Sequence, residues 1–218
     1  KINQWQTMPK VTPLEERYRW APNAGSTGRY VNRATGRYVS ELTVRADLDQ
    51  YIVNKNAGID ALANQLRNRE ISLADWQLQM RNEMRAMHNA AAIVAKGGKA
   101  QMTQADWGRT GRELRSQYEY LDKWAADIAS GKAPLDGRAN VRAKLYGQAA
   151  RGTYEQERRA VAADKGNDEE MRILHAKESC KGCIAIAGYW APIGTLPKIG
   201  SQECSSNDMC TFEYRRAK

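Results

Sequence analysis

The fold of this chain is decided by residues 72–98, which read SLADWQLQMRNEMRAMHNAAAIVAKGG. Large apolar side chains recur here at intervals of three and four residues, which is the spacing of one face of an α-helix. They are Leu73, Trp76, Met80, Met84, Met87, Ala91 and Val94. Ser72 can cap the first turn, with Asp75 in place of the usual Glu of a capping box, and the Gly-Gly pair at 97–98 stops the helix. The stretch therefore predicts a buried helix with defined ends.

The opening of this helix recurs at Thr103, where Thr-Gln-Ala-Asp-Trp repeats the pattern Ser-Leu-Ala-Asp-Trp. The helical spacing then continues through Leu114, Tyr118 and Leu121. Two helices that are built alike and joined by a Gly-Gly turn predict an antiparallel pair.

A further helix is expected on each side of this pair. Ser40 can cap a helix over residues 41–69, and a looser apolar stripe predicts another over residues 137–164. In the second of these, small residues leave a thin face that another backbone can approach closely. They are Gly147, Ala149, Ala150 and Gly152. The sequence thus predicts a mainly α fold with a helical body of about four helices.

The chain before this body has a different character. Residues 1–27 contain three prolines with large aromatic residues between them, so regular structure is not expected there. We expect an extended arm that docks on a neighbouring subunit or packs back on its own core. The sequence Gly-Arg-Tyr-Val then occurs twice, at residues 28–31 and 36–39, with turn-forming residues between the copies. Two β-favouring segments around a turn predict a short N-terminal β-hairpin.

The cysteines are confined to the C-terminal part, at Cys180, Cys183, Cys204 and Cys210. A Cys-x2-Cys pair on a Lys-Gly turn brings two sulfurs to one edge of a tetrahedron, and the later pair can supply the opposite edge. We expect these four residues to hold one structural zinc ion. The chain then divides into an arm and hairpin (1–39), a helical body (40–165) and a small Cys-rich module (166–218).

Other states of the cysteines stay open. The second pair is spaced Cys-x5-Cys, which is wider than the strongest zinc pattern, so two disulfides or buried free thiols are alternatives. We see no secretory segment and no apolar run near twenty residues, and we therefore expect no membrane contact and synthesis in a reducing cytoplasm, where disulfides are disfavoured. His175 can also replace one sulfur as a ligand.

The formal net charge of +9 is concentrated before the module. From Gly166 onward the chain has seven Lys or Arg residues and seven Asp or Glu residues, so the whole excess of positive charge lies in residues 1–165. A basic body indicates an acidic partner, such as nucleic acid or an acidic protein surface, or else a solvated basic face. The same two interpretations apply to the cations of the last helix, which are Arg138, Arg142, Lys144, Arg151, Arg158 and Arg159.

Catalytic chemistry has little support in this sequence. It contains two histidines and lacks a Walker A motif, a G-x-G-x-x-G after a strand and an H-E-x-x-H. His88 lies one turn from Met84 on the apolar stripe, so we expect a core or boundary histidine and not a catalytic one. We do not expect an enzyme.

The C-terminal stretch resembles the cysteine tail of tailed-phage minor head, or head morphogenesis, proteins. It reads Cys180-Lys-Gly-Cys183, then a Pro- and Gly-rich loop with Pro192, Gly194 and Pro197, then Cys204 and Cys210 before a last strand. The segment 36–40 that leads into a helix and the Ala-Asp-Trp helix starts also look like those of phage virion proteins. The resemblance covers roughly the last forty residues most closely.

Membership of that family implies a virion component made in the bacterial cytoplasm and located in the phage head or at its portal vertex. It implies phage capsid or portal proteins as partners and several copies of the chain in one particle. The basic body would then face packaged DNA or an acidic capsid surface. We therefore expect a minor structural protein that links capsid or portal subunits and supports head assembly. The alternative is a zinc-containing nucleic-acid-binding protein that acts free in the cell.

Overall fold

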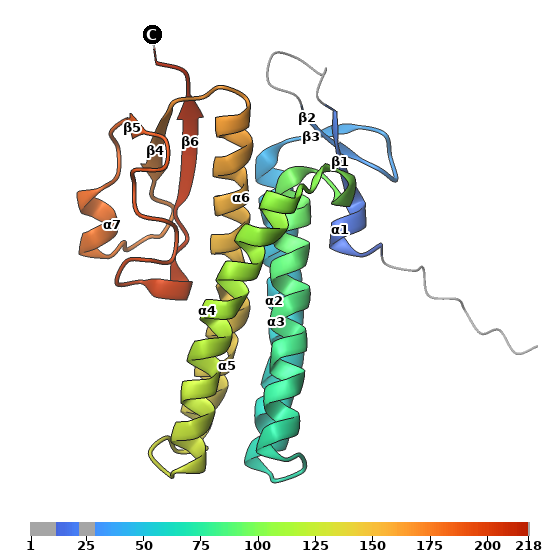
Figure 1. The fold of residues 1–218 in the computed structure, drawn as a ribbon, viewed down its shortest axis with the longest axis vertical. Helices are drawn as coiled ribbons and strands as arrows, with labels where there is room; N and C mark the ends of the chain where they lie inside the picture. Colours follow the sequence, from blue (N-terminus) through green and yellow to red (C-terminus); the bar gives the residue numbers. More distant parts are fainter. Residues whose placement is uncertain (1–11, 22–28, 218) are drawn as a thin grey trace, which may run out of the picture.

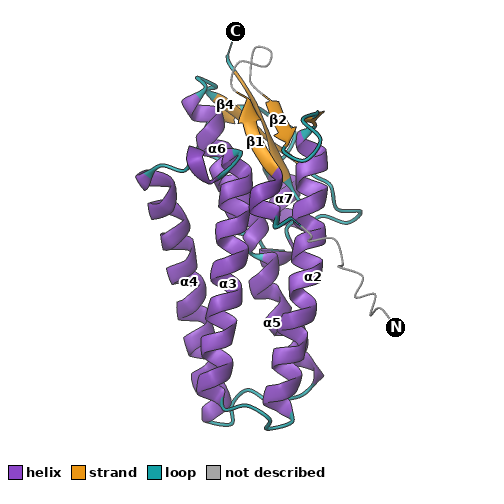
Figure 2. Cartoon of the chain, turned by 90° about the vertical axis from the view of Figure 1, so that its right-hand side faces the viewer, coloured by secondary structure: helices purple, strands orange, loops and turns teal. Residues whose placement is uncertain are grey.

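The computed structural model describes residues 12–21 and 29–217, and it has the mainly α fold that the sequence predicts. Five long helices form the body and run along its length (Figures 1 and 2). They are α2 (Glu41–Arg67), α3 (Leu73–Lys96), α4 (Gln104–Ala129), α5 (Gly137–Gln148) and α6 (Ala150–Asp164). None of the helices within the described ranges is long and apolar enough to cross a membrane.

The predicted helix starts are confirmed by their capping contacts. The backbone N–H of Thr43 donates to Ser40 Oγ at 3.1 Å, and that of Asp75 donates to Ser72 Oγ at 3.0 Å. Thr103 forms a full capping box with Asp106 at the start of α4. These side-chain oxygens satisfy backbone donors that have no partner inside the helix, which fixes where each helix begins.

The end of α3 is fixed by two glycines and an aromatic residue. Gly97 has a left-handed φ of +79°, and the N–H of Gly98 returns to the carbonyl of Ile93 at 2.8 Å. A Cβ at Gly97 would lie 2.5 Å from Trp20 Cβ, so a side chain has no room there. A short 3₁₀ turn, η1 (Lys99–Gln101), then leads into α4, which runs antiparallel to α3 as predicted (Figure 1).

The core lies along the apolar stripe of α3. Trp76, Met80, Met84 and Met87 are fully buried, and the Trp76 ring meets the ring of Trp124 of α4 edge to face at 5.1 Å. The methionines therefore pack the core, where their flexible side chains fill irregular space.

The single helix predicted over residues 137–164 is wrong, because the chain bends at Ala149 and forms two helices. α5 lies against α2, whereas α6 lies mainly against α3. At Gly147 a Cβ would overlap the side chain of Asn56 in α2, so the approach to α2 depends on glycine. The bend lets one segment pack on two different helices in turn.

The N-terminal hairpin is confirmed and is part of a three-stranded antiparallel sheet. Strands β2 (Arg29–Asn32) and β3 (Tyr38–Val39) form the predicted hairpin, and β1 (Tyr18–Ala21) pairs with the other edge of β2. The expectation that residues 1–27 lack regular structure is wrong for α1 (Leu14–Arg17) and β1. Leu14 and Tyr18 are buried in the same core as the helices, and that burial outweighs the nearby prolines. The rest of the predicted arm lies outside the described residues.

The cysteine module, residues 166–218, contains a second small sheet. Its strands are β4 (Glu169–Ile173), β5 (Ala191–Pro192) and β6 (Thr211–Arg215), with β4 in the middle. Cys183 lies in a short helix α7 (Lys181–Ala185), and Cys180 is the residue before it. Cys204 directly precedes a 3₁₀ turn η2 (Ser205–Asn207), and β6 begins directly after Cys210. The module has its own core of Cys183, Leu196, Ile199, Cys210 and Phe212.

The module is fixed to the helical body along α6 (Figure 1). Arg159 of α6 donates to the carbonyl of Leu196 at 3.0 Å, lies 2.7 Å from Glu170 of β4 and covers the ring of Phe212. Gly152 of α6 also faces the carbonyl oxygen of Ile199, which is 3.0 Å from where a Cβ would stand. Of the small residues predicted to form a thin face, Gly152 is therefore where the module's backbone approaches the body, whereas Gly147 faces α2.

Candidate metal centre

The first two cysteines are positioned by the start of α7. Cys180 is the N-cap residue of this helix, and the backbone N–H of Cys183 donates to the Cys180 sulfur at 3.4 Å. Gly182 lies between them, and a Cβ there would overlap the side chain of Gln202. The Lys-Gly turn therefore keeps the loop that carries Cys204 close to both sulfurs.

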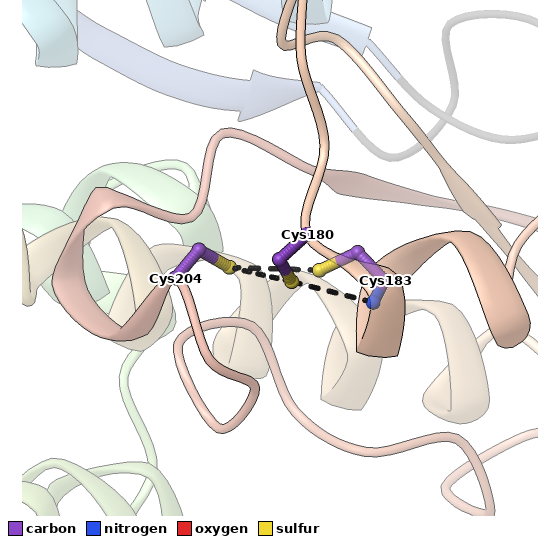
Figure 3. A group of neighbouring side chains, drawn as sticks. All are labelled: Cys180, Cys183 and Cys204. Carbon is purple, nitrogen blue, oxygen red and sulfur yellow. Dashed lines mark hydrogen bonds between the residues drawn. The ribbon is translucent and has the colours of Figure 1, made fainter.

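Three sulfurs point toward one another (Figure 3). The Cys204 sulfur lies 3.6 Å from that of Cys180 and 3.5 Å from that of Cys183. A disulfide would require about 2.05 Å, and all four cysteines are free thiols. Zinc–sulfur bonds of about 2.3 Å place two ligands about 3.8 Å apart in a tetrahedron. The observed sulfur–sulfur distances are therefore close to the ligand–ligand distance of a tetrahedral metal site.

The fourth cysteine lies beside this group. Cys210, Cys183 and Asp208 have ligand atoms within 4.8 Å of one another, as do Cys180, Cys183 and Cys204. Cys183 is common to both groups. All four predicted cysteines are thus close together and can hold a metal ion, with Cys210 on the inner side where it is buried.

Two charged residues that the sequence did not indicate lie against the cysteines. Arg172 of β4 donates to the sulfur of Cys183 at 3.3 Å and forms a buried ion pair with Asp208. Asp208 also accepts from the N–H groups of Gly200 at 2.9 Å and Cys210 at 2.9 Å. The carboxylate therefore holds the two loops that flank Cys204. The one signal in the sequence is that Asp208 stands two residues before Cys210.

The environments of the thiols differ. The N–H of Cys183 lowers the pKa of the Cys180 thiol to about 7. Burial raises the pKa of the Cys210 thiol to about 12, and it also raises the pKa of Cys183 and Cys204. Burial acts to raise the pKa of Asp208, but the N–H groups of Gly200 and Cys210, with a smaller contribution from the Arg172 cation, lower it below its ordinary value. Cys180, which is only half-buried, is thus the thiol that ionises most easily and the natural first ligand.

The two histidines are not part of this cluster. Nε2 of His175 forms a hydrogen bond with the hydroxyl of Thr211 at 2.8 Å. His175 belongs to neither group of potential ligands in the described residues. His88 is buried in the helical core, as predicted, with Nδ1 at 2.7 Å from Thr153 Oγ1.

The cations of α5 and α6 mostly have carboxylate partners. Ion pairs connect Arg138 with Asp136, Lys144 with Asp60, Arg151 with Asp49, Arg158 with Glu41 and Arg159 with Glu170. Arg142 instead lies over the ring of Trp124, at 4.7 Å. Lys144, Arg151 and Arg158 connect these helices to α2, and Arg159 connects α6 to β4, which favours the structural interpretation of this segment over a row of phosphate contacts.

The donor set suits a soft metal ion. Thiolates select zinc, copper(I) or iron–sulfur clusters over the hard cations. Comparison of the chain with protein-family models, with curated proteins and with solved structures gave no match. The resemblance to phage head proteins therefore stays a prediction.

Proposed function

We propose that Cys180, Cys183, Cys204 and Cys210 hold one structural zinc ion. The Sγ–Sγ separations of 3.5 and 3.6 Å carry this proposal, because they are close to the tetrahedral edge expected for zinc. Cys210 is the proposed fourth ligand, and Asp208 is its nearest competitor. A closed set of four thiolates leaves no position for a substrate, so the ion would act as a staple for a module with a small core.

The identity of the metal and of the fourth ligand can be tested together. Protein purified under reducing conditions should contain close to one zinc per chain, and cobalt(II) should give the intense visible absorption of a tetrahedral thiolate site. Cys210→Ser should change that spectrum, whereas Asp208→Asn should leave it unchanged. If Asp208→Asn changes the spectrum and Cys210→Ser does not, the fourth ligand is the carboxylate. Protein without metal and with two mapped disulfides would contradict the site.

We further propose that the chain is a minor structural protein of a tailed-phage head that links capsid or portal subunits. Two features support this role: the resemblance of the cysteine tail, and a module clamped to the body by Arg159 and the close contact at Gly152. A rigid pair of units with a thiolate staple is suited to joining neighbours in a particle. Capsid, portal and further copies of this chain are the proposed partners, and the virion is the proposed location.

This role is tested by the composition of purified particles. The chain should remain with DNA-filled heads through a density gradient, at a constant ratio to the portal protein. Replacement of both Cys180 and Cys183 by Ser should lower the yield of infectious particles, while Ser206→Ala, in the same module but outside the sulfur cluster, should not. Heads that lack the chain, or normal infectivity of the double variant, would contradict the proposal.

A further inference from the structure

A groove of about 810 Å³ separates the N-terminal sheet from the cysteine module. Its lining comes from β1, β2 and β3 on one side and β6 on the other, with the start of α2 and the last two turns of α6 between them. Both sheets lie at the same end of the molecule, on either side of α6 (Figure 1). This volume is typical of sites that bind a ligand.

Five aromatic residues line the groove, and Tyr30 and Phe212 among them are buried. The five are Trp20, Tyr30, Tyr38, Phe212 and Tyr214. Tyr38 is 58% exposed, and the guanidinium carbon of Arg29 lies 5.8 Å from the centre of its ring. An exposed ring with a cation beside it can stack a planar group and neutralise a nearby negative charge.

Arg158 and Tyr214 line this groove and carry hydrogen-bond donors that have no partner within the described ranges. Nε and Nη2 of Arg158 bind Glu41, at 3.0 and 2.6 Å, but its Nη1 is buried and has no hydrogen-bond partner in the part of the chain that the structure describes. The hydroxyl of Tyr214 is also buried and has no hydrogen-bond partner among the described residues. Both atoms are enclosed by the surrounding protein, so they lie behind the wall of the groove and do not contact a ligand in it directly.

Lys165 adds a charge that no carboxylate neutralises at close range. Its ammonium group lies 3.6 Å from the centre of the Trp20 ring, and no Asp or Glu oxygen of residues 12–21 and 29–217 lies within 4 Å of it. Residues 1–11, 22–28 and 218 contain no Asp or Glu. Burial, with a contribution from Arg158, lowers the pKa of Lys165 to about 8, so the group is still mainly charged at neutral pH.

The charge of the whole groove has the same sign. Four cations line it, Arg29, Arg45, Arg158 and Lys165. Arg45 and Arg158 are paired with Glu155 and Glu41, which leaves Arg29 and Lys165 against Glu213 and a net positive charge. A ligand for this surface is therefore anionic and carries flat groups. Phosphates and bases of a nucleic acid meet both conditions, whereas an acidic peptide need not supply a flat group for the exposed ring.

We propose that this groove binds single-stranded nucleic acid, with a base stacked on Tyr38 and a phosphate held by the charges of Lys165 and Arg29. A single strand is required because the bases of a duplex are stacked on each other and cannot reach a ring inside a groove. This binding does not depend on the proposed place in a virion or on the metal.

The proposal is tested with the purified full chain and a fluorescent 12-residue oligothymidylate at low salt. Wild-type protein should raise the anisotropy of the probe and bind a duplex of the same length more weakly. Tyr38→Ala and Lys165→Gln should each weaken binding of the single strand by about fivefold or more. Two matched controls should bind as wild type: Tyr120→Ala, which removes a ring of similar exposure (56%) on α4, and Lys132→Gln, which removes an exposed charge between α4 and α5.

Other outcomes would overturn the proposal. Equal weakening by the control variants, or equal affinity for the duplex, would mean attraction by the overall positive charge. Competition by inorganic phosphate at the concentration of the oligonucleotide would mean an anion site without base recognition. Tighter binding of a poly-glutamate peptide would identify an acidic protein as the partner, and no binding of any probe would remove the site. Each result is independent of whether the chain is found in particles.

Discussion

His88 shows how one buried side chain couples the stability of this protein to pH. It is almost completely buried, and its Nε2 has no hydrogen-bond partner in the described part of the chain. Burial lowers the pKa of His88 to about 4. In the unfolded chain the ring titrates near 6.5, so below that pH the unfolded state binds more protons. The folded state is therefore destabilised as pH falls from about 6.5 to about 4.

We expect His88 to reduce the free energy of unfolding by about 2 kcal/mol between pH 7 and pH 5. Glu155 acts in the opposite direction, because burial raises the pKa of this carboxyl to about 7 and its protonated form is favoured in the folded state over the same range. The pH dependence of wild-type stability alone does not separate the effect of His88 from that of Glu155. Urea unfolding of wild type and of His88→Gln gives the free energy of unfolding at both pH values. The difference between the two proteins in how this free energy changes with pH is the contribution of His88. The same pH dependence in both proteins would contradict this assignment.

Gly152 is a second single residue with a measurable role. A methyl group there would meet the carbonyl oxygen of Ile199 at 3.0 Å, and this oxygen belongs to a backbone that cannot easily move. Gly152→Ala should therefore destabilise the protein by about 1–3 kcal/mol, the usual range for overpacking. Gly58→Ala is the control, because a Cβ at that helical position meets no atom within 4 Å. It should stabilise the protein by about 0.5–1 kcal/mol, and thermal unfolding of both variants measures the contrast.

At the scale of elements, β4 explains what the sequence could not predict. In Glu-Glu-Met-Arg-Ile the apolar residues Met171 and Ile173 are the expected inward positions of a strand. The structure buries Glu170 and Arg172 completely instead, because Arg159 and Asp208 supply their counter-charges from α6 and from the loop before β6. Both partners are distant in sequence, so no local pattern contains this information. For the same reason the sequence did not predict that Arg172 and Asp208 lie against the cysteines.

The helices were predictable because their signals are local. The stripe of α3, the caps at Ser40, Ser72 and Thr103, and the Gly-Gly stop need no knowledge of distant residues. The bend at Ala149 was not predictable, since it depends on α5 packing against α2 and α6 packing against α3. The spacing of the cysteines predicted their proximity, but the inner place of Cys210 depends on how β6 pairs with β4.

The buried pair between β4 and Asp208 gives an element-scale prediction. The side chains of Arg172 and Asp208 are 0% and 1% exposed. Arg172→Met leaves a buried carboxylate without its cation, which should cost about 3–5 kcal/mol. Adding Asp208→Asn should recover part of this loss, because the amide keeps an acceptor for Cys210 N–H but carries no charge. A double-mutant cycle from urea unfolding in excess zinc measures the coupling, and simple additivity of the two changes would contradict it.

At the scale of the molecule, two separate hydrophobic cores predict two separable responses. The body has a large core that includes residues of α1, the first sheet and α2–α6, whereas the core of the module contains five buried residues. Removal of the proposed metal with a strong chelator under reducing conditions should open the module and leave the body folded. Limited proteolysis should then cut within residues 166–218, while the far-ultraviolet helical signal changes little.

The control is the same treatment followed by added zinc, which should restore protease resistance. Loss of the helical signal together with that of the module would mean that the whole chain unfolds as one unit. Unchanged protease resistance after verified metal removal would mean that the contacts of Arg159 and Gly152 hold the module without a staple.

The ion pairs between α2 and α6 also determine when this protein can fold during synthesis. Arg45 binds Glu155 and Glu41 binds Arg158, contacts that span 110 and 117 residues of chain. Such contacts raise the contact order of the body. A nascent chain must therefore leave the ribosome beyond residue 158 before α2 finds its charged partners, while α3 and α4 can already pair. The Cys180–Cys204 contact spans only 24 residues and emerges last, so the module closes quickly onto a body that has just been completed.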